Sequence, residues 1–309
     1  MMYFLYAFLA TLLAFLASPV LAIAGMANWR GMRHRVGILP AVNGSSDRPV
    51  IWFHAASVGE VAGLTAIVSA FIRVQPDWRV VVSTMTRTGL DHARRMVPDV
   101  HGLCLVPLDV PIIVRRAFVR FSPRALVFVE GELWPCLIEE AVRSGCRVAL
   151  VNGRMSDRSY PRYRTIRRLT RRMLSRLALL CAQTETDANR FIDCGASPDR
   201  VIVTGNVKVD LMSSTPPSSR TVLRQMLGLP EAEPVIIAGS TRPGEEEMVF
   251  EAFIAVRARH PEARLICAPR HLDRLPDVQR SLREHGLPFI RRSEIQPLSV
   301  LTPDPRPLT

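Results

Sequence analysis

The segment P-V-I-W-F-H-A-A-S-V-G-E, residues 49–60, decides the fold of this chain. Residues 50–53 form a short apolar run of β-branched and aromatic side chains, which is typical of a buried parallel strand. Small residues follow at 55–59, and a helix is predicted to begin at about Glu60. Such a strand, turn and helix resemble the first unit of a doubly wound sheet, in which ligands bind beyond the carboxyl ends of the strands.

Glu60 allows two interpretations at this position. A carboxylate in the first turn of a helix is favoured by the helix dipole by roughly 0.3–1 kcal/mol, and this needs no further function. The same carboxylate would also lie at the mouth of a crevice, where a general base can meet an incoming hydroxyl group. This segment alone leaves both interpretations open.

The rest of the chain continues the alternation of strands and helices that is typical of an α/β fold. Apolar runs predict further parallel strands of a first domain at residues 80–83, 103–106, 125–129, 148–151, 179–182 and 201–203. The segment M-S-S-T-P-P-S-S at 212–219 has the composition of a linker. Beyond it, predicted strands at 235–238 and 265–268 flank a helix at 245–259. We therefore expect domains at 29–211 and 221–309, joined by a linker at 212–220.

Residues 1–28 predict a membrane anchor. No charged residue precedes Arg30, and the nearly apolar stretch 3–24 is long enough for the roughly 20 residues that cross a bilayer. Arg30, Arg33 and Arg35 follow it, so the positive-inside rule places the domains on the cytoplasmic side. A cleaved signal peptide is the alternative, suggested by S-P-V-L-A at 18–22, but its usual charged start is missing.

The formal net charge of +12 predicts an anionic partner, which composition alone leaves as nucleic acid, an anionic membrane or a phosphorylated ligand. Seven arginines between residues 162 and 176 surround apolar residues at helical spacing, which predicts a basic amphipathic helix over 160–177. This helix either packs on its own domain or lies against anionic headgroups, where each surface Lys or Arg contributes about 1 kcal/mol. Nucleic acid is disfavoured because the sequence contains no recognisable nucleic-acid-binding module.

Polar residues gather where the predicted strands end. The clusters are T-M-T-R-T-G at 84–89, E-G-E-L-W-P at 130–135, T-G-N-V-K-V-D at 204–210, G-S-T-R-P-G-E at 239–245 and P-R-H at 269–271. Two carboxylates at a strand end, Glu130 and Glu132, need a basic neighbour, water or a function if they are desolvated. No cluster has the spacing of metal ligands. The six cysteines lack C-x-x-C pairs and predict thiols in a reducing compartment.

In this order, the motifs resemble those of the Kdo transferases, bacterial inner-membrane glycosyltransferases that add 3-deoxy-D-manno-octulosonic acid (Kdo) to the lipid A precursor. The resemblance runs to about Arg274. It rests on H-A-A-S-V-G-E (54–60), T-M-T-R-T-G (84–89), E-G-E-L-W-P (130–135), N-G-R-M-S-D-R-S (152–159), G-N-V-K-V-D (205–210), A-G-S-T-R-P-G-E-E (238–246) and A-P-R-H (268–271).

The resemblance implies a GT-B fold, with two Rossmann-like domains and the active site between them. It implies CMP-Kdo as donor, lipid A precursor (lipid IVA) as acceptor, anionic lipid of the inner membrane as a further partner, and neither cofactor nor nucleic acid. Glu60 matches the general base of an inverting transfer, and Glu130 matches a second catalytic carboxylate. The implied substrate-binding residues are Ser57, Gly59, Thr84, Thr88 and Glu132, together with Lys208, Ser240 and Arg270 on the donor side.

The sequence departs from the family's pattern at Gly131, Cys136, Gly153 and Arg242, where Thr, Asn, Ala and His are usual. The family also continues into a G-E-L turn and an E-P-containing segment that grip the nucleotide. The second domain is therefore expected to be incomplete, and the chain is expected to bind acceptor but to transfer little sugar. Two alternatives stay open: a GT-B glycosyltransferase with another donor or acceptor, and a non-catalytic membrane-bound lipid A binder.

Overall fold

The structure of this chain is a computed structural model that describes residues 2–27, 29–45, 47–97, 99–209 and 219–295. The side chains of residues 19–30 are also outside the description. The chain divides into two units, Met1–Ser214 and Thr215–Thr309. Most of the predicted linker falls on residues 210–218, which lie outside the described residues.

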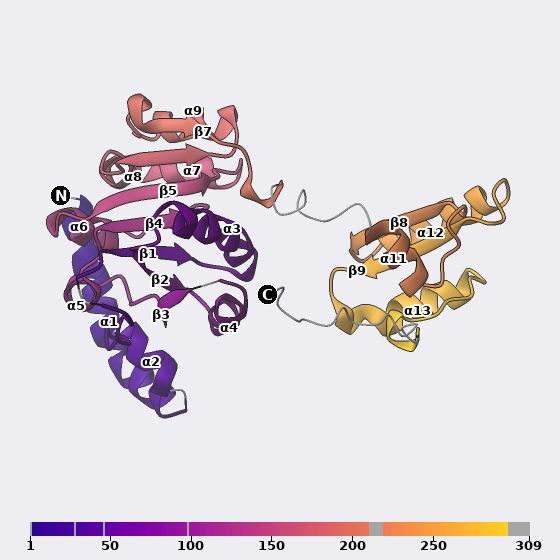
Figure 1. The fold of residues 1–309 in the computed structure, drawn as a ribbon, viewed down its shortest axis with the longest axis horizontal. Coiled ribbons are helices and arrows are strands. Elements are labelled where there is room, and N and C mark those ends of the chain that lie inside the picture. The colour runs from indigo at the N-terminus through magenta and orange to yellow at the C-terminus, as the bar shows by residue number, and fades with distance from the viewer. Residues whose placement is uncertain (1, 28, 46, 98, 210–218, 296–309) are drawn as a thin grey trace, which may run out of the picture. The chain divides into compact units, whose positions relative to one another are not determined.

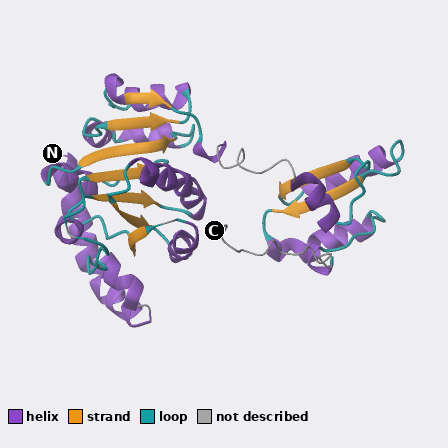
Figure 2. Cartoon of the chain, in the orientation of Figure 1, coloured by secondary structure: helices purple, strands orange, loops and turns teal. Residues whose placement is uncertain are grey.

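A parallel sheet forms the centre of the first unit (Figures 1 and 2). Its strands are β1 (Val50–Ala55), β2 (Arg79–Thr84), β3 (Val100–Leu105), β4 (Ala125–Val129), β5 (Arg147–Gly153), β6 (Leu179–Ala182) and β7 (Val201–Val203). Their order is β3-β2-β1-β4-β5-β6-β7, and every neighbouring pair is parallel. The strands predicted from the apolar runs are all present, with small differences at their ends. Because the order reverses between β1 and β4, the sheet is doubly wound and has its switch point there.

The register of the central strands brings three turns to one edge of the sheet. Ala55 at the end of β1 pairs with Thr84 at the end of β2. On the other side of β1, His54 pairs with Phe128, one residue before the end of β4. The turns that follow β1, β2 and β4 therefore begin side by side at the switch point, where doubly wound sheets bind their ligands.

Helices cover both faces of this sheet (Figure 2). They are α3 (Val58–Val74), α4 (Arg87–Met96), α5 (Pro111–Phe121), α6 (Pro135–Arg143), α7 (Ser159–Thr165), α8 (Arg167–Leu174) and α9 (Glu185–Asp193), with a short 3-10 segment at Pro198–Arg200. Along β1 the side chains alternate between the two cores, because successive residues of a strand point to opposite faces. Phe53 packs with Leu64 of α3, whereas Trp52 packs with Phe118 and Phe121 of α5.

Two N-terminal helices, α1 (Met2–Ala27) and α2 (Trp29–Arg35), precede the sheet (Figure 1). The first turns of α1 pack on the core of the first unit, where the Tyr6 hydroxyl donates to Asp109 at 3.0 Å. The same carboxylate accepts from the backbone N–H groups of Cys136 and Leu137 at the start of α6. No helix in the part of the chain that the structure describes is long and apolar enough to cross a membrane, so the predicted spanning anchor is not supported.

The basic segment forms two helices rather than the single helix predicted over 160–177. α7 ends and α8 begins around Ile166, whose φ of −102° and ψ of 32° depart from helical values. The Thr170 hydroxyl donates to the Tyr163 carbonyl, which a continuous helix would offer to a backbone N–H four residues on. The apolar stripe of this segment faces the unit's own core, since Leu169 and Met173 are buried there.

The second unit contains a pair of parallel strands, β8 (Val235–Thr241) and β9 (Arg264–Pro269). Its helices are α11 (Ser219–Met226), α12 (Glu245–Arg257) and α13 (Leu275–Glu284), with 3-10 segments at Leu272–Arg274 and Arg292–Glu294. The two strands and the helix predicted for this region are confirmed. Phe250 and Phe253 of α12 form the core with Val278 of α13.

Candidate active site

Glu60 lies in the first turn of α3, directly beyond the end of β1. Its Oε2 accepts a hydrogen bond from the backbone N–H of Ala56 at 2.7 Å, and its Oε1 accepts one from the Ser57 hydroxyl at 3.1 Å. The Ser57 hydroxyl in turn accepts from the backbone N–H of Glu60 at 3.3 Å. The Ser57 hydroxyl therefore caps α3, and Glu60 lies in the first helical turn, as the sequence predicted to within two residues. The same contacts hold its carboxylate in one orientation at the switch point.

The electrostatic surroundings make Glu60 a stronger proton acceptor than an exposed carboxylate. Burial of the side chain raises its pKa above the ordinary value, although the hydrogen bonds from Ala56 and Ser57 act in the opposite direction. The nearby negative charges of Glu130 and Glu132 raise the pKa further. A raised carboxylate pKa is a common property of general bases, because the base then works closer to neutral pH.

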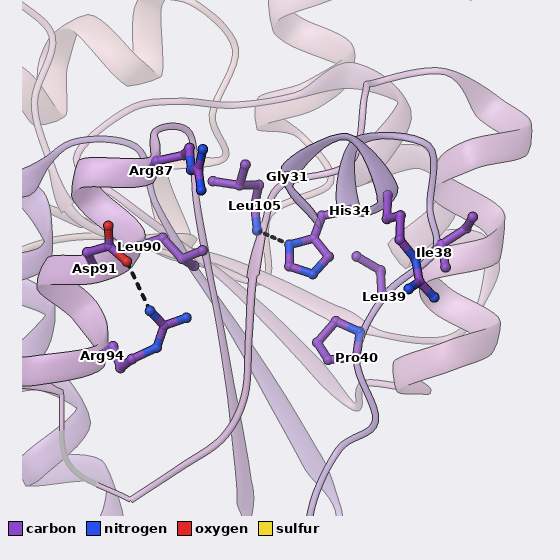
Figure 3. A pocket seen from close by; sticks show the side chains of 11 residues that line it. Gly31, His34, Ile38, Leu39, Pro40, Arg87, Leu90, Asp91, Arg94 and Leu105 are labelled. Atoms are coloured by element: carbon purple, nitrogen blue, oxygen red, sulfur yellow. Dashed lines mark hydrogen bonds and ion pairs between the residues drawn. The ribbon is translucent and has the colours of Figure 1, made fainter. Parts of the chain in front are cut away.

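The turn after β2 is hydrogen-bonded both to the turn after β1, which precedes Glu60, and to α2. The backbone N–H of Met85 donates to the carbonyl of Ala56 at 3.3 Å, which links the turns after β1 and β2. Arg35 of α2 donates to the Met85 carbonyl, and also to the Val106 carbonyl at 2.9 Å. Beyond Met85, Arg87 borders a cavity that α2 and α4 enclose (Figure 3). Thus α2 fixes one side of the candidate site.

The two threonines predicted to bind substrate lie in this turn. Thr84 is fully buried and its hydroxyl donates to the carbonyl of Thr86 at 3.0 Å. Thr88 is exposed, and its hydroxyl shares a hydrogen bond of 3.1 Å with that of Thr86. Thr84 therefore shapes the turn from inside, whereas Thr88 is available to a ligand.

Glu130 follows β4 across the switch point from Glu60, and it is paired with a lysine. Lys208 Nζ lies 2.6 Å from Glu130 Oε1, and the Asn152 amide lies 3.4 Å from the same oxygen. The Asn152 side-chain oxygen accepts from the backbone N–H of Val207 at 3.1 Å. Asn152 therefore bridges the carboxylate and the turn that carries the lysine. Asn152 belongs to the motif N-G-R-M-S-D-R-S, but the sequence indicates no role for it, because its partners are far away in the chain.

Backbone strain marks the same place. Glu130 has a φ of 65° and Asn152 a φ of 54°, which lie in the left-handed region. For residues other than glycine this conformation costs roughly 1–2 kcal/mol each. Two backbone hydrogen bonds hold Glu130 in this conformation. Its N–H donates to the carbonyl of Val151 at 3.0 Å, and its carbonyl accepts from the N–H of Arg154 at 2.9 Å. Such strain is retained where surrounding structure requires it, and it is common at functional sites.

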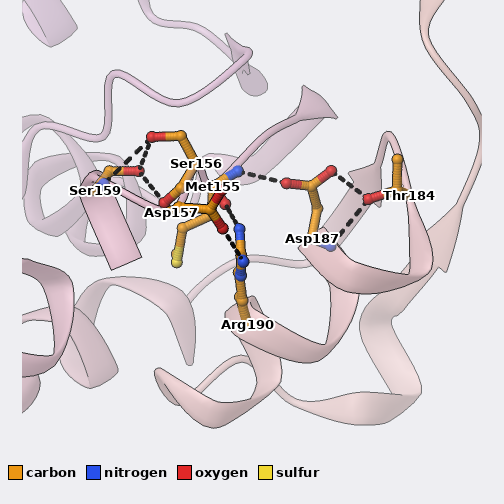
Figure 4. A network of polar contacts seen from close by, with 7 residues as sticks. All are labelled: Met155, Ser156, Asp157, Ser159, Thr184, Asp187 and Arg190. Carbon is orange, nitrogen blue, oxygen red and sulfur yellow. Dashed lines mark hydrogen bonds and ion pairs between the residues drawn. The ribbon is translucent and has the colours of Figure 1, made fainter. Parts of the chain in front are cut away.

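The loop after β5, which carries N-G-R-M-S-D-R-S, is held by a buried carboxylate (Figure 4). Asp187 of α9 accepts from the backbone N–H of Met155 at 2.7 Å and from the Thr184 hydroxyl at 2.6 Å. Arg190 donates to the Met155 carbonyl at 2.7 Å and also pairs with Asp157. This network fixes the path of the loop beside Glu130, so the motif has a clear structural role.

The predicted donor-side residues of the second unit lie together at the ends of its strands. Ser240 has a φ of 58° and sits where the register of β8 and β9 shifts, between Gly239 and Thr241. The backbone N–H of Arg270 donates to the Thr241 carbonyl at 3.0 Å. The side chains of Ser240 and Arg270 are exposed.

The first unit thus assembles most of the predicted site. One group lies where β1 passes into α3 and where β2 passes into α4: Ser57, Gly59, Glu60, Thr84 and Thr88. Across the switch point lie Glu130, Glu132 and Lys208. Ser240 and Arg270 form a separate group in the second unit. Arg35 was interpreted from sequence only as part of the charge after an anchor, and no sequence signal indicated its contacts with the turn after β2.

Comparison with known proteins identifies the relatives of this chain. The family model described as 3-deoxy-D-manno-octulosonic-acid transferase (kdotransferase) matches residues 30–211. The 3-deoxy-D-manno-octulosonic acid transferase of Chlamydia trachomatis serovar A is 32% identical over 251 residues, covering 81% of this chain and 57% of that protein. The transferase of the same name from Haemophilus influenzae is 30% identical over 298 residues, covering 93% of this chain and 68% of that protein.

The chain spans little more than half the length of the Chlamydia relative. Among solved structures, the UDP-GlcNAc 2-epimerase from Neisseria meningitidis, bound to UDP-GlcNAc, is similar with a TM-score of 0.56 at 13% identity, covering 77% of this chain and 70% of that one. This likeness supports an α/β GT-B-like fold with a parallel sheet, as the sequence predicted. The family match and the identity to curated relatives show that the chain belongs to the 3-deoxy-D-manno-octulosonic-acid (Kdo) transferase family.

Proposed function

We propose that this chain acts in the transfer of Kdo from CMP-Kdo to the lipid A precursor, lipid IVA, in lipopolysaccharide biosynthesis. The observation that carries this proposal is the placement of Glu60 at the switch point of the sheet, with a raised pKa and with Glu130 nearby. Family membership supports the sugar and the reaction class.

In the proposed reaction, a glucosamine hydroxyl of the acceptor attacks the anomeric carbon of the donor sugar. A new carbon–oxygen bond forms on one face while the bond to the CMP phosphate breaks on the other, so the configuration inverts. Glu60 takes the hydroxyl proton and CMP leaves with the bonding electrons. General base catalysis of this kind contributes typically 10²–10⁴-fold to the rate.

Lys208 supplies the positive charge that this reaction needs near the leaving group. Its ammonium lies 2.6 Å from Glu130 Oε1, and 43% of its side chain is exposed to solvent. An exposed cation held by a carboxylate can turn toward incoming negative charge without a large rearrangement. In the second unit, Ser240 and Arg270 are proposed to bind the donor, and Arg270 would offset charge on its carboxylate or phosphate.

The decisive experiment replaces Glu60 by Gln. Gln keeps an oxygen that can accept the hydrogen bond from the backbone N–H of Ala56, but it cannot take the proton from the acceptor hydroxyl. We expect CMP-Kdo-dependent transfer to fall by at least about 100-fold, with a melting temperature close to that of the wild type. Transfer is measured with the purified chain, and with the chain fused to the C-terminal part of the Chlamydia trachomatis relative.

The matched control is Glu185→Gln, because Glu185 also lies in the first turn of a helix, α9, but is outside the candidate site. This control should retain transfer. Near-normal turnover of Glu60→Gln would show that another group is the base.

We also propose that the chain attaches to the inner membrane, with both units on the cytoplasmic side. One face of α1 presents large apolar side chains to solvent: Phe4, Leu5, Phe8, Leu9, Leu12, Leu13, Phe15 and Leu16. α1 contacts the basic helix α8, and the Arg172 guanidinium lies 5.1 Å from the centre of the Tyr3 ring. An apolar helix face beside basic side chains suits the boundary between acyl chains and anionic headgroups.

A further inference from the structure

A cavity of about 380 Å³ lies between α2, the segment that follows it and α4 (Figure 3). Its apolar lining includes Leu39, Leu90 and Leu105, whose side chains are buried. The sequence does not predict ligand binding for the polar residues of the cavity's lining on α2 and α4, which include Arg33, His34, Arg87 and Arg94. This cavity is distinct from the turn that holds Glu60.

The rim of the cavity is cationic. Arg33, Arg87 and Arg94 line it, and Asp91 is the acidic residue among its lining. Asp91 pairs with Arg94 at 2.9 Å, whereas Arg33 and Arg87 make no ion pair within the described part of the chain. The two guanidinium groups that remain each present a planar set of N–H donors, a geometry that suits phosphate oxygens.

His34 adds a neutral donor to this rim. Its Nδ1 accepts a hydrogen bond from the backbone N–H of Leu105 at 3.2 Å, so the ring proton resides on Nε2. Burial lowers the pKa of His34, and the neighbouring charges of Arg33 and Arg35 lower it further. The ring therefore stays neutral near pH 7 and offers a single N–H group without adding charge.

The cavity is joined to the candidate active site through a short path of contacts. Arg87 begins α4, directly after the turn that follows β2. In that turn the backbone N–H of Met85 donates to the carbonyl of Ala56, whose own N–H donates to the Glu60 carboxylate. On its other side the cavity is bounded by α2, which follows the apolar helix α1 in the chain. A glycolipid whose acyl chains lie beside α1 and whose sugar hydroxyl reaches Glu60 would place its headgroup in this region.

We propose that this cavity binds a phosphate monoester of the glycolipid acceptor, with Arg87 contacting the phosphate oxygens, His34 Nε2–H as a further donor and Arg33 adding positive charge at the rim. The assignment rests on the proposed function for the identity of the acceptor. The apolar lining suits the sugar ring and linker atoms beside the phosphate, and the paired Arg94 and Asp91 close the rim on the α4 side.

The test measures binding of lipid A precursor, in detergent micelles, to the full purified chain, before and after enzymatic removal of the acceptor's phosphates. Arg87→Met should weaken binding of the phosphorylated acceptor about tenfold, as expected for loss of one charge-assisted contact, and leave binding of the dephosphorylated acceptor unchanged. The matched control is Arg95→Met on the same helix, since Arg95 is exposed and does not line the cavity. It should change neither affinity.

The outcomes separate this inference from the proposed function. Equal binding of both acceptors by the wild type, or an equal loss for both in Arg87→Met, would overturn the phosphate assignment even if Glu60-dependent transfer is found. Arg87-dependent binding of the phosphorylated acceptor, without any Kdo transfer by the chain fused to the C-terminal part of the Chlamydia trachomatis relative, would support the cavity and refute the proposed reaction. If inorganic phosphate alone binds through Arg87 and does not compete with the glycolipid, the cavity takes free phosphate and the assignment is wrong.

Discussion

The carboxylate of Glu60 is positioned by hydrogen bonds from Ala56 and Ser57, and the Ser57 hydroxyl also caps α3. The structural and the catalytic interpretations of this residue are therefore compatible rather than alternatives. A base must be held in one orientation to be effective, and here the residue that caps the helix also holds the base. The consequence is that substitutions of Ser57 should disturb both helix stability and the orientation of the base.

The pH dependence of transfer follows from the charges around Glu60. A base works in its ionised form, so activity is present above its pKa and is lost as the pH falls through that value. Because Glu132 raises this pKa, Glu132→Gln should lower it and move the acid limb of kcat/KM to lower pH. The pH profile of the variant is compared with that of Glu185→Gln, which should leave the limb in place. An unchanged limb in Glu132→Gln would mean that another group controls it.

Arg35 connects α2 to the turns that surround Glu60, and its removal should destabilise the first unit. Arg35→Met leaves the carbonyls of Met85 and Val106 without their charged donor, which we expect to lower the free energy of unfolding by about 2–4 kcal/mol. Urea denaturation measures this. Arg35→Lys should recover part of the loss because it keeps one donor, and Arg33→Met, at an exposed position, should cost little. A loss under 0.5 kcal/mol in Arg35→Met, by the same denaturation, would contradict the contact.

At the scale of elements, α3 packs closely against the turn that carries Lys208. A Cβ atom at Gly63 would lie only 2.9 Å from Val207 Cγ1. The backbone N–H of Val207 donates a hydrogen bond to the Asn152 side chain, which also contacts Glu130. The absence of a side chain at Gly63 thus lets the helix approach the lysine turn. The distance between Lys208 and Glu130 depends on a glycine in another element.

This packing predicts that Gly63→Ala disturbs the site although alanine favours helices by about 1 kcal/mol. The added methyl group should displace Val207 and with it Lys208, and lower transfer between about tenfold and a hundredfold. The double variant Gly63→Ala/Val207→Ala removes the clash and should restore most of the activity. If the double variant stays as impaired as the single one, the effect does not arise from this contact.

At the scale of the whole molecule, the exposed apolar face of α1 and the basic helices belong to the same unit. Arg162, Arg167 and Arg168 are exposed and make no ion pair among the residues that the structure describes. Apolar insertion is insensitive to salt, whereas attraction between exposed charges is screened beyond a Debye length of roughly 8 Å at physiological salt. The two contributions to membrane binding can therefore be separated by experiment.

We expect the double variant Phe8→Asn/Phe15→Asn to bind vesicles containing phosphatidylglycerol at low salt but to be released at high salt, because these side chains are 63% and 74% exposed on α1. Flotation of the purified protein with the vesicles measures this. Val119→Asn is the control, since Val119 is 75% exposed but belongs to α5 rather than to the apolar face of α1. Flotation of the double variant at high salt at the wild-type level would exclude α1 as the inserting element.

The sequence by itself determined the strands of both units and, to within two residues, the start of the helix that carries Glu60. Apolar β-branched runs and small-residue turns are local signals, and each strand needs only its neighbours in the chain to be predicted. The motifs at the strand ends also identified the family before any geometry was known. Their positions at one edge of the sheet follow from parallel strand order, which the alternating pattern implies.

Only the tertiary structure decided how the candidate site is held together. Arg35 meets Met85 across 50 residues and Lys208 meets Glu130 across 78, and no local pattern predicts such pairs. The break between α7 and α8 is of the same kind, because the contacts that bury Leu169 and Met173 in the core outweigh a continuous helical pattern. The cationic cavity likewise exists only because the tertiary structure brings α2 and α4 to line the same space. Local propensity selects elements, whereas contacts between distant residues select the geometry that chemistry requires.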